Sequence, residues 1–409
     1  MDSSSITLAL GAATLAAWVV LWLFRGGFWC IDREPVPSPP DACPDVVAVI
    51  PARNEAEVIG ETLRSLWAQE YPGCLRIVLV DDHSHDGTSD VALQAAAANG
   101  READLQLLQA EPLPAGWTGK LWAMEQGLRR GLPAGDPARY VLFSDADISH
   151  GPGALRELVA RAEAGPCDLV SFMVRLECRS RAERLMIPAF VFFFKLLYPF
   201  RQINDPRHPL AGAAGGTMLL RREALERIGG MACIRNALID DCSLGAAVKR
   251  GGHRIWLGMS EESRSTRGYG TLDEILRMIA RTAYTQLGYN PLVLAGCVLG
   301  LGFTFLAPPL LLLFATGWGQ LLGGLACLLL TALFVPMVRF YRLSPLWALL
   351  LPVTACVYLW ATVLSAWWHH RGKGGQWKGR SQAPSNALNQ SGSHSGSHDP
   401  HGAEPPRYT

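Results

Sequence analysis

Long apolar runs lie at both ends of the chain, and a pattern of shorter period fills the middle. The run at residues 6–24 is uncharged and about as long as a bilayer is thick. It follows MDSSS, which lacks the basic residues of a signal peptide, so we expect a retained anchor at residues 1–25. Three further runs that can each span a membrane predict a transmembrane bundle over 286–370; they lie at residues 291–316, 320–338 and 346–368.

From residue 46 to about 258 the pattern is that of an α/β domain. Short runs rich in β-branched residues or leucine predict strands at residues 46–50, 75–80, 105–108, 140–143 and 168–174. Helical segments alternate with them, such as 55–69, where apolar side chains recur every three or four positions. We therefore predict an α/β fold with a mostly parallel sheet and helices on both faces, which binds ligands at the carboxyl ends of its strands. We place this domain at residues 46–285.

Three other segments have distinctive compositions. Residues 33–45 form a proline-rich linker, and residues 381–409 form a Ser/Gly/His/Pro-rich tail that we predict to be disordered. The apolar segment 184–202 contains Pro188, Pro199 and Lys195, which argue against a full span. We expect a helix in the membrane interface whose lysine and arginine reach the lipid headgroups; a buried core helix is the alternative.

Composition excludes several classes of function. The formal net charge is +1 over 409 residues, so no polycationic surface for nucleic acid is indicated. The ten cysteines are scattered without a C-x-x-C pair, which predicts reduced thiols and neither a zinc site nor a disulfide framework.

Candidate chemistry begins with two carboxylates in YVLFSDADIS. Asp145 and Asp147 are separated by one residue, so on an extended strand both side chains would point to the same face. Like charges that close repel unless a proton, an arginine or a metal ion lies between them. Mg²⁺ or Mn²⁺ prefers oxygen ligands and commonly joins protein carboxylates to a diphosphate. The D-x-D pattern alone is weak, and a solvated turn is the alternative.

Three further motifs place polar residues after predicted strands. VVAVIPARNE ends a strand at Pro51, and IVLVDDHSHDGT ends another at Asp81 and Asp82, where a carboxylate can accept hydrogen bonds from a base or a ribose. The bland alternative is that Asp86 or Thr88 caps the next helix. LPAGWTGKLWA contains a glycine-rich turn with a lysine where a helix starts, which suits phosphate, although it is not a P-loop.

Taken in order, the motifs IPARNE, VDDHSHDGT, GWTGK, DAD, GAAGGTMLLRR and LIDDCSLG resemble those of family 2 glycosyltransferases with the GT-A fold. Within that family the chain is similar to the hopene-associated membrane glycosyltransferases of bacteria. The resemblance covers roughly residues 46–281. It implies a nucleotide-sugar donor, a divalent cation (Mg²⁺ or Mn²⁺), and a strand formed by GAAGGTMLL beneath the sugar.

The resemblance also implies roles for donor-side residues. Pro51, Glu55 and Asp82 match positions around the nucleobase and ribose, and Lys120 matches a residue near the diphosphate. Asp147 would bind the metal. Asp145 would contact the ribose and the sugar and is the second candidate metal ligand.

On the acceptor side, Asp241 matches the catalytic base, and Asp240 stands where the family usually has glutamate. Residues 277–283, RMIARTA, keep Arg281 but lack the glutamine and tryptophan of the Q-x-x-R-W motif of polymerising members. This departure favours transfer of a single sugar. Arg277 and Arg281 are candidates for contact with the diphosphate. The alternative is that they form an arginine pair at the membrane interface, just before the apolar runs. QWKGR, near the end, resembles a basic tail beside the site of lipid-glycosylating relatives, or is a stop-transfer flank.

We therefore expect an inverting, metal-dependent glycosyltransferase that moves a single sugar from a nucleotide-sugar, UDP-linked by expectation, to a lipid hydroxyl such as that of a hopanoid or other terpenoid. The alternatives are a ceramide or polyprenyl-phosphate glycosyltransferase and a non-catalytic nucleotide-sugar-binding scaffold. We expect a multi-pass protein of the bacterial cytoplasmic membrane with its catalytic domain in the cytoplasm. Three C-terminal spans would leave the basic segment 369–380 outside, against the positive-inside rule, so residues 291–316 are a candidate re-entrant segment.

Overall fold

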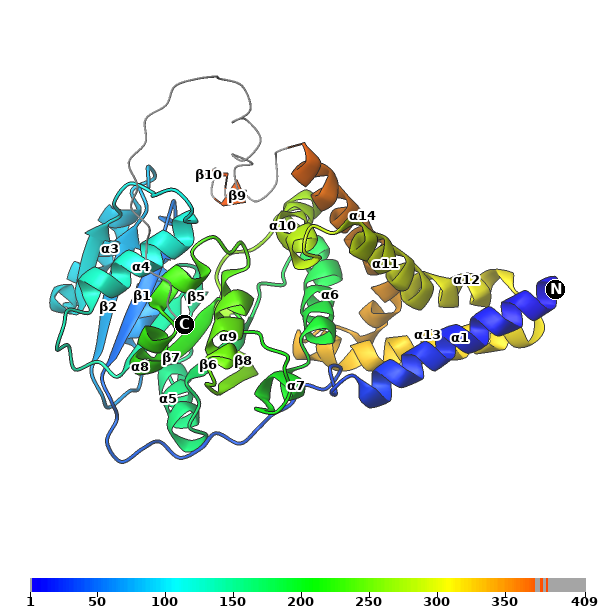
Figure 1. Ribbon diagram of the computed structural model, residues 1–409, viewed down its shortest axis with the longest axis horizontal. Coiled ribbons are helices and arrows are strands. Elements are labelled where there is room, and N and C mark those ends of the chain that lie inside the picture. Colours follow the sequence, from blue (N-terminus) through cyan, green and yellow to red (C-terminus); the bar gives the residue numbers. More distant parts are fainter. Residues whose placement is uncertain (1, 372–375, 378–379, 382–409) are drawn as a thin grey trace, which may run out of the picture.

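The protein combines a sheet-based domain with long apolar helices that extend from one side of it (Figure 1). The computed structural model describes residues 2–371, 376–377 and 380–381, so the predicted disordered tail lies outside the described residues except for Ser381. The chain runs from the apolar helix α1 (Ser3–Phe24), through the sheet-based domain, to the C-terminal helices α11–α14.

Eight strands form one mixed sheet in the order β3-β2-β1-β4-β7-β6-β8-β5. The strands are β1 (Val46–Ala52), β2 (Leu75–Asp81), β3 (Leu105–Gln109), β4 (Tyr140–Ser144), β5 (Ile148–Ser149), β6 (Leu169–Arg175), β7 (Thr217–Arg221) and β8 (Ile255–Ser265). All five predicted strands are confirmed, and so is the α/β class. The sheet is less uniformly parallel than expected, because β7 runs antiparallel to both β4 and β6, and β5 runs antiparallel to β8.

Helices cover both faces of this sheet. Apolar side chains alternate along β1, where Val46, Ala48 and Ile50 pack on one face and Val47 and Val49 on the other. The first face is covered by α2 (Ile59–Trp67), α3 (Thr88–Ala98) and α5 (Ala154–Ala164), and the second by α4 (Gly119–Gly131) and α9 (Asp240–Arg250). The helix expected at 55–69 is shorter than predicted, because its first residues form a turn at the end of β1.

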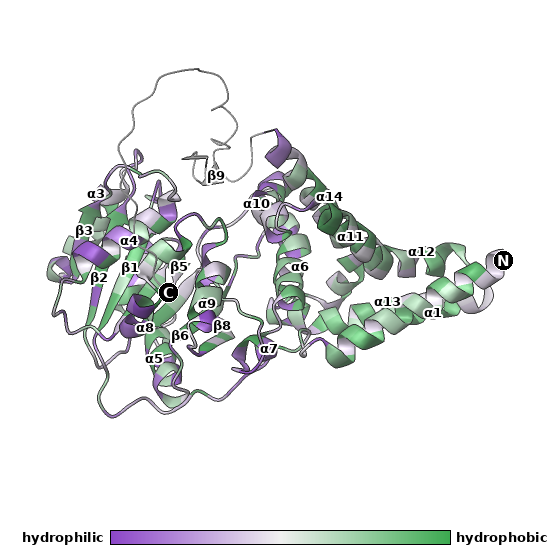
Figure 2. Ribbon diagram, viewed as in Figure 1, coloured by the Kyte–Doolittle hydropathy of each residue, from purple (hydrophilic) through white to green (hydrophobic). Residues whose placement is uncertain are grey.

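Four helical segments are long and apolar enough to cross a membrane, and Figure 2 shows their hydrophobic character. They are α1, Pro291–Phe314, Gly317–Phe340 (α13) and Pro345–His370. The second consists of α11 (Pro291–Leu301), a π-helical turn (Gly302–Leu306) and α12 (Ala307–Phe314); the fourth consists of a 3₁₀ helix (Pro345–Leu350) and α14 (Leu351–His370).

The ends of these helices fall into two groups. The starts of α1 and α13 meet far from the sheet, where Thr7 touches Gly319. The end of α1 is held at the domain, because Arg25 donates to the carbonyls of Leu196 and Leu197. Helix α14 contacts the domain side near both of its ends: Thr354 donates to the carbonyl of Leu185 in α6, and His369 stacks on Tyr289 just after α10, with ring centroids 4.3 Å apart.

Helix α6 (Arg181–Leu197) lies between the sheet and the apolar helices (Figure 1). On one side, Phe192 packs against Phe334 of α13 and Phe193 against Tyr358 of α14. The prediction that Lys195 reaches the lipid headgroups is wrong. Its side chain is buried and its ammonium donates to the carbonyl of Cys30, and burial lowers the pKa of Lys195 to about 8.

The remaining helices connect these parts. They are α7 (Phe200–Asn204), α8 (Arg222–Arg227) and α10 (Leu272–Gln286), with short 3₁₀ turns at Glu102–Asp104 and Gly230–Ile234. Beyond α14, Gln376–Trp377 and Arg380–Ser381 form a short antiparallel pair.

Close helix packing in the apolar bundle predicts the effect of one added methyl group. A Cβ atom at Gly319 would lie 2.8 Å from Cβ of Thr7 and 2.9 Å from its backbone carbon, so α13 could not keep its distance from α1. We expect Gly319→Ala to destabilise the protein by about 1–3 kcal/mol, measured as a lower thermal unfolding midpoint in detergent. Gly296→Ala is the control, because nothing lies within 4 Å of its Cβ position. Equal midpoints for the two variants would contradict this packing.

Candidate active site

A cavity of about 400 Å³ opens at the carboxyl ends of β1, β4 and β8, beside the first turns of α4 and α9. Strands β4, β6 and β8 run in the same direction as β1, so the segments that follow them converge on this edge of the sheet. The predicted site residues that line the cavity are Pro51, Glu55, Lys120, Asp145, Asp147, Asp240, Asp241 and Arg281.

Asp145 and Asp147 reach the cavity by a different route from the one predicted. Strand β4 ends at Ser144, and the two aspartates lie in the turn between β4 and β5, so the alternation of an extended strand does not orient them. The turn is held from several sides. The Thr62 hydroxyl donates to the Ala146 carbonyl at 2.7 Å, and the Thr266 backbone donates to the Asp147 carbonyl at 2.7 Å.

Lys120 joins the two acidic groups of the cavity. Its ammonium lies 2.7 Å from Oδ1 of Asp145 and 2.8 Å from Oδ2 of Asp240. Although burial disfavours the ammonium, the two carboxylates hold the pKa of Lys120 above its ordinary value. Burial works against ionised Asp240 too, but Lys120 holds the pKa of Asp240 below its ordinary value. The lysine expected to face phosphate thus neutralises carboxylates in the ligand-free protein.

Asp241 lies at the start of α9, and two backbone N–H groups orient its carboxylate. Its Oδ2 accepts from the Gly215 backbone at 2.9 Å and its Oδ1 from the Cys242 backbone at 2.7 Å. Burial, followed by the charge of neighbouring Asp240, raises the pKa of Asp241 to about 6. A side chain at Gly215 would place its Cβ 3.3 Å from Asp241, so glycine leaves room for this carboxylate. Only the end of GAAGGTMLL forms the expected strand, which begins at Thr217.

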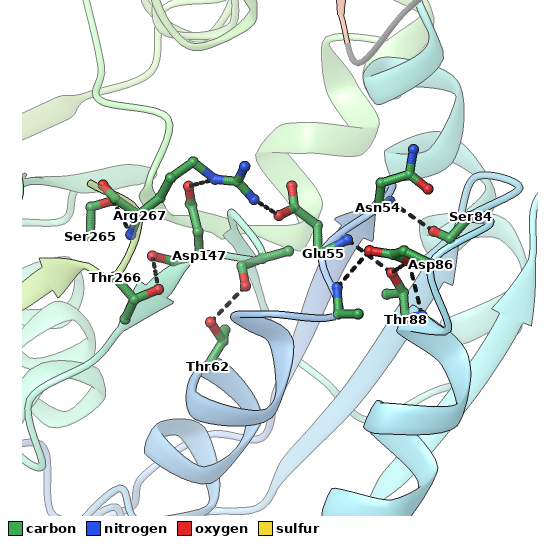
Figure 3. Close-up of polar contacts among 12 residues, drawn as sticks. Asn54, Glu55, Thr62, Ser84, Asp86, Thr88, Asp147, Ser265, Thr266 and Arg267 are labelled. Atoms are coloured by element: carbon green, nitrogen blue, oxygen red, sulfur yellow. Dashed lines mark hydrogen bonds and ion pairs between the residues drawn. The ribbon is translucent and has the colours of Figure 1, made fainter. Parts of the chain in front are cut away.

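Arg267 is a cavity residue that the sequence did not reveal. Its guanidinium donates to Oε2 of Glu55 and, through Nε at 3.3 Å, to Oδ2 of Asp147 (Figure 3). Glu55 is itself positioned by its backbone, which donates to the Thr88 hydroxyl at 2.8 Å. Arg267 follows β8, a strand that was not predicted. Had β8 been recognised, the rule that polar site residues follow strands would have pointed to Arg267.

Asp82 is not among the described residues that line this cavity, so its expected place at the nucleotide stays a prediction. It is 1% exposed, and its Oδ2 lies 3.6 Å from Nη1 of Arg53. The chain turns at this point, because the carboxylate of Asp81 accepts from the Ser84 backbone and the Ser89 hydroxyl. The more modest expectation for this loop is confirmed in part: Asp86 Oδ1 accepts from the Thr88 backbone at the start of α3.

The charges of the cavity do not balance. Within the described part of the chain, five carboxylates and three cationic side chains line the cavity, a formal excess of two negative charges when all are ionised. Hard oxygen donors with that excess suit a divalent cation. Among the described residues no group of three or more His, Cys, Asp or Glu side chains is arranged to hold a metal ion. The donor set therefore fits Mg²⁺ or Mn²⁺ held by one or two carboxylates, with the remaining ligands coming from a bound molecule and water.

The opposite wall of the cavity is apolar. Phe190 and Phe194, one turn apart on α6, line it together with Met278 of α10. Arg281 also lines the cavity, whereas Arg277 pairs with Asp273 at 2.6 Å and is largely exposed. The two arginines that the sequence left as a pair therefore have different surroundings.

The family model described as "Glycosyltransferase like family 2" matches residues 44–285, more than half of the chain. The chain belongs to this family. The matched residues contain the whole eight-stranded sheet and every predicted site residue. No curated protein matches this glycosyltransferase.

The first of two similar solved structures supports the GT-A fold. The mannosyltransferase PcManGT from Pyrobaculum calidifontis, in complex with GDP-Man and Mn²⁺, has a TM-score of 0.54 at 19% identity, over 90% of this chain and 99% of that one. The glucosyl-3-phosphoglycerate synthase of Mycobacterium tuberculosis, in complex with Mn²⁺, UDP and glucosyl-3-phosphoglycerate, has a TM-score of 0.39 at 21% identity, over 60% of this chain and 79% of that one.

The lysine bridge predicts how stability depends on pH. In Lys120→Gln, Asp145 and Asp240 lose this cation. Burial already raises the pKa of Asp145 in the wild type, so that pKa rises further, and the pKa of Asp240, which Lys120 holds low, rises above that of the unfolded chain. Folding then binds protons, and the variant becomes less stable as pH rises through those values. Each unit of pKa shift corresponds to about 1.4 kcal/mol, so we expect the deficit relative to wild type to grow by about that amount between pH 5 and pH 8 in thermal unfolding.

The control is Lys249→Gln, whose ammonium donates to the carbonyls of Ile203, Asp205 and Leu210 rather than to carboxylates. Its deficit should differ less between the two pH values. A Lys120→Gln deficit of equal size at pH 5 and pH 8 would argue against the carboxylate bridge.

Proposed function

We propose that the protein is a membrane-bound inverting glycosyltransferase that moves a single sugar from a nucleotide-sugar, UDP-linked, to a hydroxyl group of a lipid. One observation carries this proposal. The D-x-D aspartates and the acidic pair of α9 line one cavity whose opposite wall is the apolar face of α6. A single sugar bound there can contact both acidic groups while a hydrophobic acceptor lies against the phenylalanines.

On the donor side, Asp147 and Asp145 would hold a divalent cation, Mg²⁺ or Mn²⁺. When bound, the cation supplies positive charge that stabilises the departing nucleoside diphosphate. Lys120, already beside Asp145, is within reach of the same diphosphate and adds a second positive charge. Pro51 and Glu55 line the part of the cavity nearest β1, where the base and ribose would lie.

On the acceptor side, Asp241 acts as the general base. Its carboxylate takes the hydroxyl proton as the acceptor oxygen forms a bond with the anomeric carbon, and the bond from that carbon to the diphosphate oxygen breaks with its electron pair leaving on the diphosphate. A single displacement inverts the anomeric centre. A pKa of about 6 suits this task, because the carboxylate is ionised at neutral pH yet more basic than an ordinary aspartate.

The acceptor is a neutral alcohol rather than a polyprenyl phosphate. A phosphate is anionic at neutral pH and needs no base, and Asp240 and Asp241 would repel it. An alcohol on an apolar body matches both the base and the wall formed by Phe190 and Phe194. The resemblance of the chain to hopene-associated glycosyltransferases favours a hopanoid or other terpenoid alcohol, with ceramide as the second candidate. Loss of the Q-x-x-R-W pattern favours transfer of one sugar only.

We assign three membrane crossings to the apolar helices. Helix α1, the segment α11–α12 and helix α13 each connect the far end of the bundle with the domain, whereas α14 contacts the domain side near both of its ends. We therefore assign the re-entrant role to α14 instead of residues 291–316. The end of α14, with Arg371 directly after it, then lies on the same side as the catalytic domain, which we take to be the cytoplasmic side of a bacterial membrane, in keeping with the positive-inside rule.

Transfer activity is tested with membranes containing the full-length protein, a panel of UDP-sugars, and hopanoid or ceramide acceptors, with Mn²⁺ or with chelator. We expect Mn²⁺-dependent transfer that falls about 10²–10⁴-fold in Asp241→Asn, which loses the base. Below pH 6, kcat/KM of the wild type should fall about tenfold per pH unit, because the base must be deprotonated.

The control for this experiment is Asp104→Asn, an exposed aspartate that pairs with Arg101 on the surface, and it should retain activity. Undiminished turnover in Asp241→Asn would refute the base. Turnover that resists the chelator would refute the metal.

The apolar wall is tested by truncating one phenylalanine. In Phe194→Ala the acceptor loses part of its hydrophobic contact, so we expect the KM for the lipid to rise about tenfold while the KM for the UDP-sugar stays unchanged. Leu197→Ala, three residues further along α6 and half exposed, serves as the control. Equal effects on both KM values in Phe194→Ala would exclude a lipid-binding wall.

A further inference from the structure

Arg267 stands between two groups that the proposed function assigns to the donor. Its guanidinium donates to both Glu55 and Asp147, which come from the segments after β1 and β4, and Arg267 itself follows β8 (Figure 3). This guanidinium therefore contacts two carboxylates that follow separate strands. Either carboxylate left unpaired beside the other acidic groups would be destabilising.

The two carboxylates are fixed more firmly than the arginine. The Asp147 carbonyl accepts from both the backbone and the hydroxyl of Thr266, and the Glu55 backbone donates to Thr88. The Arg267 side chain is 36% exposed, against 10% for Glu55 and 23% for Asp147. A change of partners at this site therefore moves the guanidinium rather than the carboxylates.

Arg267 and a divalent cation compete for the same carboxylate. The guanidinium contacts Oδ2 of Asp147, and a metal at this aspartate would bring two positive charges close together. The donor removes this conflict because it brings a diphosphate, whose oxygens match the planar fork of a guanidinium. Lys120 also contacts a proposed metal ligand, Asp145, but it keeps Asp240 as a second carboxylate partner when the cation occupies Asp145 and Asp147.

We propose that Arg267 is a donor-binding residue that serves as counter-cation to Glu55 and Asp147 in the free protein and transfers its guanidinium to the donor diphosphate when the metal reaches Asp147. This assignment rests on the proposed function. It makes metal and nucleotide binding cooperative: metal alone must displace the arginine, whereas metal with a diphosphate provides the arginine with a new partner.

The test measures binding rather than turnover. Free Mn²⁺ is titrated by electron paramagnetic resonance against the purified full-length protein, first alone and then with saturating UDP. In Arg267→Gln we expect Mn²⁺ without nucleotide to bind about tenfold more tightly, the change that one partly screened charge contact produces. In the presence of Mn²⁺ we expect UDP to bind about tenfold more weakly, because the diphosphate loses its guanidinium.

Two control variants separate charge from location. Arg267→Lys keeps the positive charge and should retain the weak Mn²⁺ binding of the wild type without nucleotide. Arg264→Gln removes a half-exposed arginine three residues earlier, which pairs with Glu61 at 3.3 Å, and should change neither affinity.

Failure of this assignment and failure of the proposed function give different results. Wild-type protein that binds Mn²⁺ and UDP together, with Arg267→Gln unchanged in Mn²⁺ affinity or in UDP affinity, would overturn the role of Arg267 alone. Wild-type protein that shows no Mn²⁺-dependent binding of UDP would overturn both.

Discussion

Among the residues that the structure describes, five carboxylates meet at one edge of the sheet with three cationic side chains. The protein manages this crowding by sharing cations: Lys120 joins Asp145 to Asp240, and Arg267 joins Glu55 to Asp147. Sharing is possible because β1, β4, β6 and β8 run the same way, so segments distant in the sequence converge at their carboxyl ends. A divalent cation can neutralise the remaining negative charge, and the oxygens of a donor diphosphate can complete the coordination of that cation.

Helix α6 connects this charged edge to the membrane part of the chain. Phe190 and Phe194 line the cavity, while Phe192 and Phe193 pack on α13 and α14. One helix thus forms the apolar wall of the site and the contact surface for the bundle. Under the proposed function, a lipid acceptor held near the apolar helices would meet Asp241 across the width of one cavity.

Local pattern predicted five of the eight strands of the mixed sheet, because these are buried runs rich in β-branched residues or leucine. The ordered motifs named most of the charged residues that line the cavity. The sequence did not predict features set by contacts between distant segments. Arg267 was missed because β8, beginning at Ile255, was not recognised as a strand. The turn geometry of Asp147 depends on Thr62 and Thr266, and the burial of Lys195 depends on Cys30, all far away in the chain.

The central claim is that a divalent cation is held between Asp147 and the diphosphate of the donor. Electron–nuclear double resonance of the Mn²⁺–UDP complex tests it most directly, because it detects phosphorus atoms bonded through oxygen to the metal. The account predicts strong ³¹P coupling in the wild type that weakens or disappears in Asp147→Asn. Bound Mn²⁺ without ³¹P coupling, or coupling of full strength in Asp147→Asn, would contradict it.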